Sequence, residues 1–177
     1  MFCFLTFTLL LGHITKSKYA ISYGNHKAKH FIVNYFDLGC AHCIEFYKKI
    51  LPKIRKKYCD KGKLLFIYEP YPVHHETLIY MTCCTDLNSA QKQALFETLM
   101  ELDQTITPKI IEECMSVLKV PYKNPTSTVL EQAMRLTEEK QYENLPVIFF
   151  DGKELSDEQQ DHLLEFLEKE IPNVSEG

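Results

Sequence analysis

The feature that most constrains this chain is a pair of cysteines separated by two residues, in the segment Cys40-Ala41-His42-Cys43. The apolar, β-branched run at residues 31–36 predicts a strand before it, and the periodicity after it predicts a helix from about Ala41 to Tyr58. Cys40 should therefore lie where a strand ends and a helix begins. Unpaired N–H groups at a helix N-terminus stabilise an anion, so a thiol there has a pKa below its usual value of about 8.5. We expect Cys40 to be reactive.

Cysteine pairs with this spacing occur in redox centres and in zinc sites. His42 can add positive charge or a hydrogen-bond donor beside a thiolate, so we expect it to tune a redox couple. His74-His75 and Cys83-Cys84 could supply further zinc ligands, but the chain lacks a second C-x-x-C or an H-x₃-H pair. We expect redox chemistry without a bound metal, and a zinc-binding domain remains an alternative.

Residues 36–46, followed by Leu51-Pro52 in the next helix, and the later segment at residues 145–153 form two motifs in a fixed order. Together they resemble the thioredoxin superfamily, and within it the DsbA-like thiol–disulfide oxidoreductases. The resemblance implies an α/β thioredoxin fold with an all-helical insertion between the second and third core strands. It also implies a cis peptide bond before Pro146, in a loop that faces Cys40. Leu145 and Pro146 would then bind an extended substrate segment.

The position of Cys40 at the helix start makes it the expected attacking sulfur, with Cys43 as the resolving thiol. The chain departs from the DsbA-like pattern at three positions. Ala41 stands where Pro is frequent, Leu145 precedes the cis-proline candidate, and Asn34 replaces a buried acid six residues before the first cysteine. Because an amide cannot accept the proton of Cys43, Glu69 or water would have to do so.

The chain divides into four expected parts. Residues 1–20 read as a signal peptide or N-terminal anchor, and residues 21–75 as the first half of the thioredoxin fold. Residues 76–141 contain four helical patterns and no convincing strand, which indicate a helical bundle. The DsbA-like resemblance implies that this bundle is the insertion. Residues 142–177 form the second half, with the cis-proline loop, a hairpin turn at Asp151-Gly152 and a last helix that begins after Ser156.

The apolar segment at residues 2–12 is too short to span a bilayer as a helix, and it fits the core of a secretory signal peptide. However, Lys16 and Lys18 follow it and no Lys or Arg precedes it, so an anchor or a buried N-terminal strand remains an alternative. We expect a periplasmic or otherwise extracytoplasmic location. The net charge of −4 gives no reason to expect nucleic acid as a partner, and the basic residues at 48–63 fit a solvated helix face.

The chain has seven cysteines, five of them outside the motif. Cys3 would leave with a signal peptide. Cys59, Cys83, Cys84 and Cys114 remain, and in an exported protein some of them could pair. A structural disulfide from Cys83 or Cys84 to Cys114 is one hypothesis. Ordinary buried thiols are the alternative.

These features predict an exported thiol–disulfide oxidoreductase that forms disulfides in other exported proteins by exchange at Cys40 and Cys43. We expect no cofactor besides the redox-active Cys40–Cys43 disulfide. The expected partners are unfolded or reduced exported proteins and a membrane or soluble redox protein, with the chain acting as a monomer. Two alternatives stay open at this point: a periplasmic disulfide reductase of the same fold, and a non-catalytic thioredoxin-like binding or chaperone module.

Overall fold

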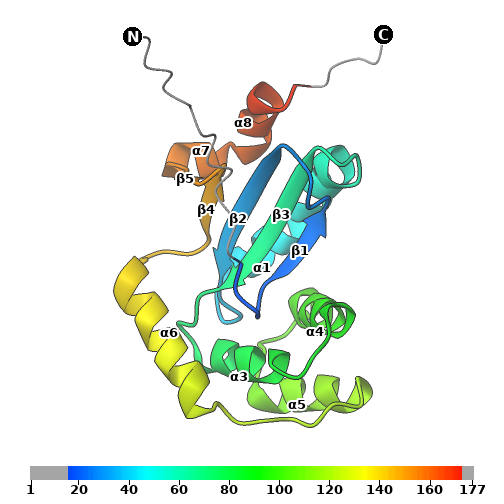
Figure 1. The fold of residues 1–177 in the computed structure, drawn as a ribbon, viewed down its shortest axis with the longest axis vertical. Helices are drawn as coiled ribbons and strands as arrows, with labels where there is room; N and C mark the ends of the chain where they lie inside the picture. Colours follow the sequence, from blue (N-terminus) through cyan, green and yellow to red (C-terminus); the bar gives the residue numbers. More distant parts are fainter. Residues whose placement is uncertain (1–15, 173–177) are drawn as a thin grey trace, which may run out of the picture.

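A mixed five-stranded sheet forms the centre of the computed structural model, which describes residues 16–172 (Figure 1). Its order is β1-β3-β2-β4-β5, and only β2 and β3 are parallel neighbours. The strands are β1 (Ile21–Gly24), β2 (His30–Phe36), β3 (Leu64–Pro70), β4 (Val147–Phe150) and β5 (Lys153–Glu154). The parallel pair at the centre places the carboxyl ends of β2 and β3 at the same edge of the sheet.

The crossover from β2 to β3 is helical, as predicted, but it is not one helix. It consists of α1 (Ala41–Lys49), α2 (Leu51–Ile54) and a π-helical turn, η1 (Arg55–Cys59). The break at Ile50 lies two residues before Pro52, which has no N–H to donate and whose ring crowds the preceding turn. The proline therefore separates the segment that carries the cysteines from the rest of the crossover.

Four helices connect β3 to β4. They are α3 (His75–Cys84), α4 (Ser89–Glu101), α5 (Pro108–Val117) and α6 (Ser127–Lys140). Figure 1 shows them gathered at one end of the molecule, away from the C-terminal helices α7 (Asp157–Asp161) and α8 (Leu163–Glu170). The predicted fold class, a thioredoxin fold with an all-helical insertion between the second and third core strands, is confirmed by this order.

The C-terminal part begins with the expected hairpin. Asp151 and Gly152 both have positive φ, at 48° and 84°, as a tight two-residue turn between β4 and β5 requires. Ser156 then caps α7 and exchanges hydrogen bonds with Gln159, which makes the predicted capping box. The single last helix that the sequence suggested is divided at His162 into α7 and α8.

Most of the apolar core lies between one face of the sheet and the helices. Alternate residues of β3 point to this face, so Phe66 and Tyr68 lie in the large core, while Leu65 and Ile67 belong to a small cluster on the opposite face. Phe96 of α4 packs against Phe36 of β2, with ring centroids 4.9 Å apart. The helical insertion and the sheet are therefore parts of one core.

The cysteines in the described part of the chain are unpaired, and the expected N-terminal segment lies largely outside that part. The six cysteines within residues 16–172 are free thiols, so the suggested disulfide from Cys83 or Cys84 to Cys114 does not form in this structure. Cys83 and Cys84 are instead packed in the apolar core. The predicted signal peptide or anchor falls largely on residues 1–15, which lie outside the described part. Among residues 16–172, no helix has the length and apolar character needed to cross a bilayer.

Candidate functional site: a cysteine pair facing a cis-proline loop

Cys40 lies between β2 and α1, where it is the N-cap residue of the helix. A turn joins the strand to the cap, with the backbone N–H of Cys40 donating to the carbonyl of Asp37 at 3.2 Å. The Cys40 sulfur in turn accepts the backbone N–H of Cys43 at 3.2 Å. The sulfur therefore occupies the position where a helix end best stabilises negative charge, as the sequence predicted.

The two thiols have very different acidities. The pKa of Cys40 is lowered to about 6, chiefly by the hydrogen bond from the Cys43 thiol and also by the backbone N–H groups of Cys43 and His42, against the opposing effect of burial. The pKa of Cys43 is raised far above its usual value by its hydrogen bond to Cys40 and by burial, since only 1% of Cys43 is exposed. At neutral pH, Cys40 is a partly accessible thiolate and Cys43 an enclosed thiol.

The loop that follows α6 faces this pair. The peptide bond from Leu145 to Pro146 is cis, which confirms the conformation that the resemblance implied. In its protonated form, the Cys40 thiol donates to the carbonyl oxygen of Leu145, with the two atoms 3.5 Å apart. A backbone acceptor thus lies next to the reactive sulfur, where an extended substrate chain bound to that sulfur could pair with the loop.

A groove lies between α1, the cis-proline loop and α7, and it is lined by His42 and Leu145, which adjoin the cysteine pair, but by neither cysteine. Its volume is about 550 Å³. Phe46 and Ile50 of α1 line it together with Leu145, Pro146 and Ile148, so part of its surface is apolar. Its polar lining is formed by His42, Glu45, Lys49, Asn144, Asp157, Gln160 and Asp161. The groove can accept a side chain next to the sulfur that reacts.

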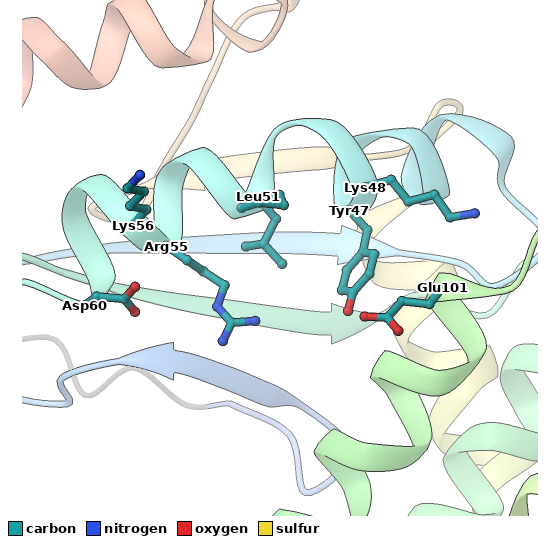
Figure 2. Close-up of a pocket in the computed structure, with 8 residues that line it drawn as sticks. Tyr47, Lys48, Leu51, Arg55, Lys56, Asp60 and Glu101 are labelled. Carbon is teal, nitrogen blue, oxygen red and sulfur yellow. The ribbon is translucent and has the colours of Figure 1, made fainter.

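A different hollow, of about 400 Å³, lies on another side of the same helical segment and is not lined by the cis-proline loop (Figure 2). Figure 2 shows Tyr47 and Glu101 directed toward each other at one end of this hollow. Arg55 and Asp60 lie at the other end. Four of the eight basic residues at 48–63 form ion pairs with acidic residues: Lys48 with Asp103, Lys49 with Glu45, Arg55 with Glu97, and Lys57 with Glu168. This compensation agrees with a solvated helix face rather than a basic docking patch.

A model of the protein family described as Thioredoxin matches residues 16–169. This chain belongs to the thioredoxin family. Its fold is similar to that of BdbD from Bacillus subtilis, with a TM-score of 0.66 and 20% identity over 86% of this chain and 93% of that one. DsbA from Chlamydia trachomatis is also similar, with a TM-score of 0.61 and 16% identity over 89% and 96% of the two chains. The family's DsbA-like branch therefore shares this chain's fold.

Curated relatives of this thioredoxin-family chain come from Rickettsia. One from Rickettsia prowazekii, named a "putative protein-disulfide oxidoreductase", is 22% identical over 84% of this chain and 60% of the relative. Relatives with the same kind of name from Rickettsia typhi and Rickettsia bellii are each 24% identical over 73% of this chain. The chain spans 60%, 53% and 56% of the lengths of these three proteins.

Of the residues that the sequence singled out, Cys40, Cys43, Leu145 and Pro146 are brought together. His42 is exposed, and its backbone N–H contributes to the low pKa of Cys40. A tuning role for the imidazole stays a prediction.

Glu69, the suggested proton acceptor, is placed elsewhere. It alternates with Tyr68 on β3, so its side chain points to the face of the sheet opposite the core that contains Cys43. Its carboxylate accepts the backbone N–H of Ser17 at 3.1 Å, and burial raises its pKa. A direct proton transfer from Cys43 would have to cross the sheet, so this geometry favours water as the acceptor.

Asn34, which departs from the DsbA-like pattern of an acid at this position, is buried in the core face of β2. Neither polar atom of its amide has a hydrogen-bond partner among the described residues. The amide leaves the cysteine pair without an ionisable group at that position.

Sequence reasoning missed Asp37 and gave His74 no redox role. Asp37 is fully buried three residues before Cys40, and its negative charge raises the pKa of both Cys40 and Cys43. His74 donates to it from Nδ1 at 2.5 Å. No group of three or more potential metal ligands gathers among residues 16–172. The one feature of the sequence that could have pointed to Asp37 was an acidic residue in the turn that precedes the first cysteine.

Proposed function

We propose that this chain is a thiol–disulfide oxidoreductase whose Cys40–Cys43 disulfide oxidises thiols in other proteins. The observation that carries the proposal is the position of the Cys40 sulfur at the start of α1 and next to the Leu145 carbonyl, where hydrogen bonds from Cys43 lower its pKa to about 6. A thiol of low pKa is a good leaving group, and stabilising its thiolate stabilises the reduced form. Both effects make the disulfide form more oxidising.

The exchange proceeds in two balanced steps. A substrate thiolate attacks the Cys40 sulfur of the disulfide, the bond between the two cysteines breaks, and Cys43 leaves and takes up a proton. A second substrate thiolate then attacks the substrate sulfur of the mixed disulfide and releases Cys40 as a thiolate. The substrate loses two electrons and gains a disulfide, while the enzyme becomes a dithiol. A partner disulfide must then remove these electrons.

The groove beside Cys40 and the cis-proline loop suit an extended, unfolded substrate segment. We infer that the substrates are unfolded or reduced proteins outside the cytoplasm, and that a membrane or soluble redox protein reoxidises the dithiol. A solved structure with 17% identity and a TM-score of 0.63 is titled a periplasmic thioredoxin-like protein from Salmonella enterica, which supports this location. The proposed cycle needs no cofactor beyond the disulfide, and one chain contains the whole site.

Equilibrium titration of the Cys40–Cys43 pair against glutathione tests the direction of the reaction. An oxidase should have a reduction potential above about −200 mV, and a general reductant one near about −270 mV. The low pKa of Cys40 predicts the higher value. A value in the range of the reductants would reject the oxidase in favour of a reductase of the same fold.

A second assay separates catalysis from simple binding. The chain should oxidise a reduced dithiol peptide, and Cys40→Ala should abolish this activity because the attacked sulfur is gone. A Cys40→Ala variant that keeps the full biological effect would instead favour a binding or chaperone module.

A further inference from the structure

A polar network next to the cysteine pair surrounds the carboxylate of Asp37, which is fully buried. One oxygen accepts the backbone N–H of Gly39 at 2.8 Å and the Nδ1–H of His74 at 2.5 Å. The other accepts the backbone N–H groups of Val73 and His74, each at 2.9 Å, and the hydroxyl of Thr77 at 2.8 Å. Five donors thus converge on one carboxylate.

This network joins two segments that are far apart in the sequence. The turn at residues 37–39 leads directly into Cys40, whereas residues 73–77 connect β3 to the helical insertion. Thr77 makes two hydrogen bonds across the junction, because its hydroxyl donates to Asp37 and accepts the backbone N–H of Leu38 at 2.9 Å. The position of Cys40 therefore depends on the start of the insertion.

The ring of His74 is in close contact with this turn. A Cβ atom added to Gly39 would lie only 2.5 to 2.9 Å from three atoms of the imidazole, so the ring packs directly on the backbone before Cys40. About half of the His74 side chain, 51%, remains exposed. Since the carboxylate can only accept, Nδ1 carries the proton of this hydrogen bond.

We propose that His74 is a positioning residue of the redox centre, which holds the turn before Cys40 and, through its bond to Asp37, weakens the effect of that buried negative charge on both sulfurs. This inference rests on the proposed function in treating Cys40 as the reacting sulfur. The sequence suggested His74 only as a possible zinc ligand, and the role proposed here involves no metal.

The electrostatic part of the proposal follows from the charges that act on the cysteines. The negative charge of Asp37 opposes ionisation of Cys40 and Cys43. A donor on the carboxylate draws part of that charge away from the sulfurs. Removing the donor should therefore make Cys40 less acidic, whereas removing the carboxylate charge should make it more acidic.

The test is a pH titration of the thiolate absorbance of the reduced protein. Burial raises the pKa of Cys59, Cys83, Cys84 and Cys114, so these thiols do not interfere at the pH where Cys40 ionises. His74→Ala should raise the pKa of Cys40 by about 0.5 to 1. His74→Asn should restore most of the wild-type value, because its amide nitrogen can occupy the place of Nδ1. His75→Ala is the matched control and should leave the titration unchanged, since the exposed neighbour is outside the network.

The double variant distinguishes a specific effect from loosened structure. Asp37→Asn should lower the pKa of Cys40, and adding His74→Ala to it should change the pKa no further. An unchanged or lowered pKa in His74→Ala would overturn the proposal, as would failure of His74→Asn to restore it. If Asp37→Asn does not fold, the three histidine variants still decide. The titration requires no substrate turnover, so a chain that fails as an oxidase but shows these shifts would reject the proposed function and keep this inference.

Discussion

The acidity of Cys40 is the residue-scale property on which the chemistry depends, and it makes the reduced protein's behaviour depend on pH. Its pKa in the folded protein is about 6, lower than the ordinary thiol value. The stability contributed by this thiolate is therefore fully present above the ordinary value and is lost as the pH falls through about 6. The disulfide form has no such titration. We expect the reduced form to lose stability relative to the oxidised form as the pH falls over this range, as measured by urea denaturation of both forms.

Two cysteine variants test whether the hydrogen bond from Cys43 causes the low pKa of Cys40. Cys43→Ala removes the hydrogen bond that contributes most to the low pKa of Cys40, so the alkylation rate of Cys40 should then rise at a higher pH than in the wild type. Cys59→Ala, a buried thiol elsewhere in the core, should not move it. If the alkylation rate of Cys40 in the wild type rises with a midpoint near the usual thiol pKa of about 8.5, the prediction is contradicted.

Asn34 offers a second prediction at this scale. Its amide is 1% exposed, and both of its polar atoms lack partners in the described part of the chain. A buried polar group without a hydrogen bond costs about 1 to 3 kcal/mol. Asn34→Leu, of similar size, should raise the free energy of unfolding by about 1 kcal/mol in urea denaturation. Asn144→Leu on the exposed loop should change it by less than about 0.5 kcal/mol, and a clear loss of stability in Asn34→Leu would show that water satisfies the amide.

The sequence predicted the residues whose roles come from local position and from the family motifs, but not those defined by long-range contacts. Cys40 could be placed at a helix start because the strand and helix patterns meet there. The partnership of Asp37 with His74 spans 37 positions, and no periodicity reports it. The side of the sheet to which Glu69 points could not be predicted for another reason. Because β3 is buried on both faces, its apolar run lacks the alternation that would show which way each residue points.

At the scale of elements, helices with explicit start signals were predicted closely. Thr107 caps α5 with Pro108 as its first residue, and Pro52 explains the break after α1. The division between α7 and α8 was not predictable, because no glycine or proline lies near His162. The π-helical turn of η1 likewise has no simple signal in the sequence.

The walls of the groove carry unequal charge. On α1, Glu45 is paired with Lys49 at 2.6 Å. On α7, Asp157 and Asp161 lie one turn apart, and neither has an ion-pair partner within residues 16–172. If the proposed function holds, a reduced peptide with a lysine beside its cysteine should be oxidised about two- to fivefold faster than one with a glutamate there. The measurement is kcat/KM for each peptide.

The charge origin of this preference can be isolated on α7 itself. Replacing both Asp157 and Asp161 with Asn should remove the difference between the peptides, and high salt should reduce it in the wild type. Glu158→Gln is the matched control, because Glu158 lies on the same helix but lines a different hollow. Equal rates for the two peptides in the wild type would refute the preference without touching the oxidase proposal.

At the scale of the whole molecule, the proposed redox centre is assembled from both halves of the chain and from the insertion between them. The cysteines come from the first half and the cis-proline loop from the second. The start of the insertion holds the turn before Cys40 through Thr77 and Asp37. Integrity of the site therefore requires that the insertion and the sheet fold as one unit.

Phe96 of α4 is the side chain on which this unity can be tested. It is fully buried, and its ring lies 4.9 Å from that of Phe36 and 5.0 Å from that of Tyr68, both in the sheet. Phe96→Ala should lower the free energy of unfolding by about 3 to 5 kcal/mol, because it leaves a cavity between the insertion and the sheet. Met134→Ala, at a position of α6 that is 59% exposed, should cost less than about 0.5 kcal/mol.

In the reduced wild type, the loss of helix measured by circular dichroism and the loss of the Cys40 thiolate absorbance should coincide in one urea transition. Separate transitions would show that the insertion unfolds alone, and the redox centre could not then depend on it.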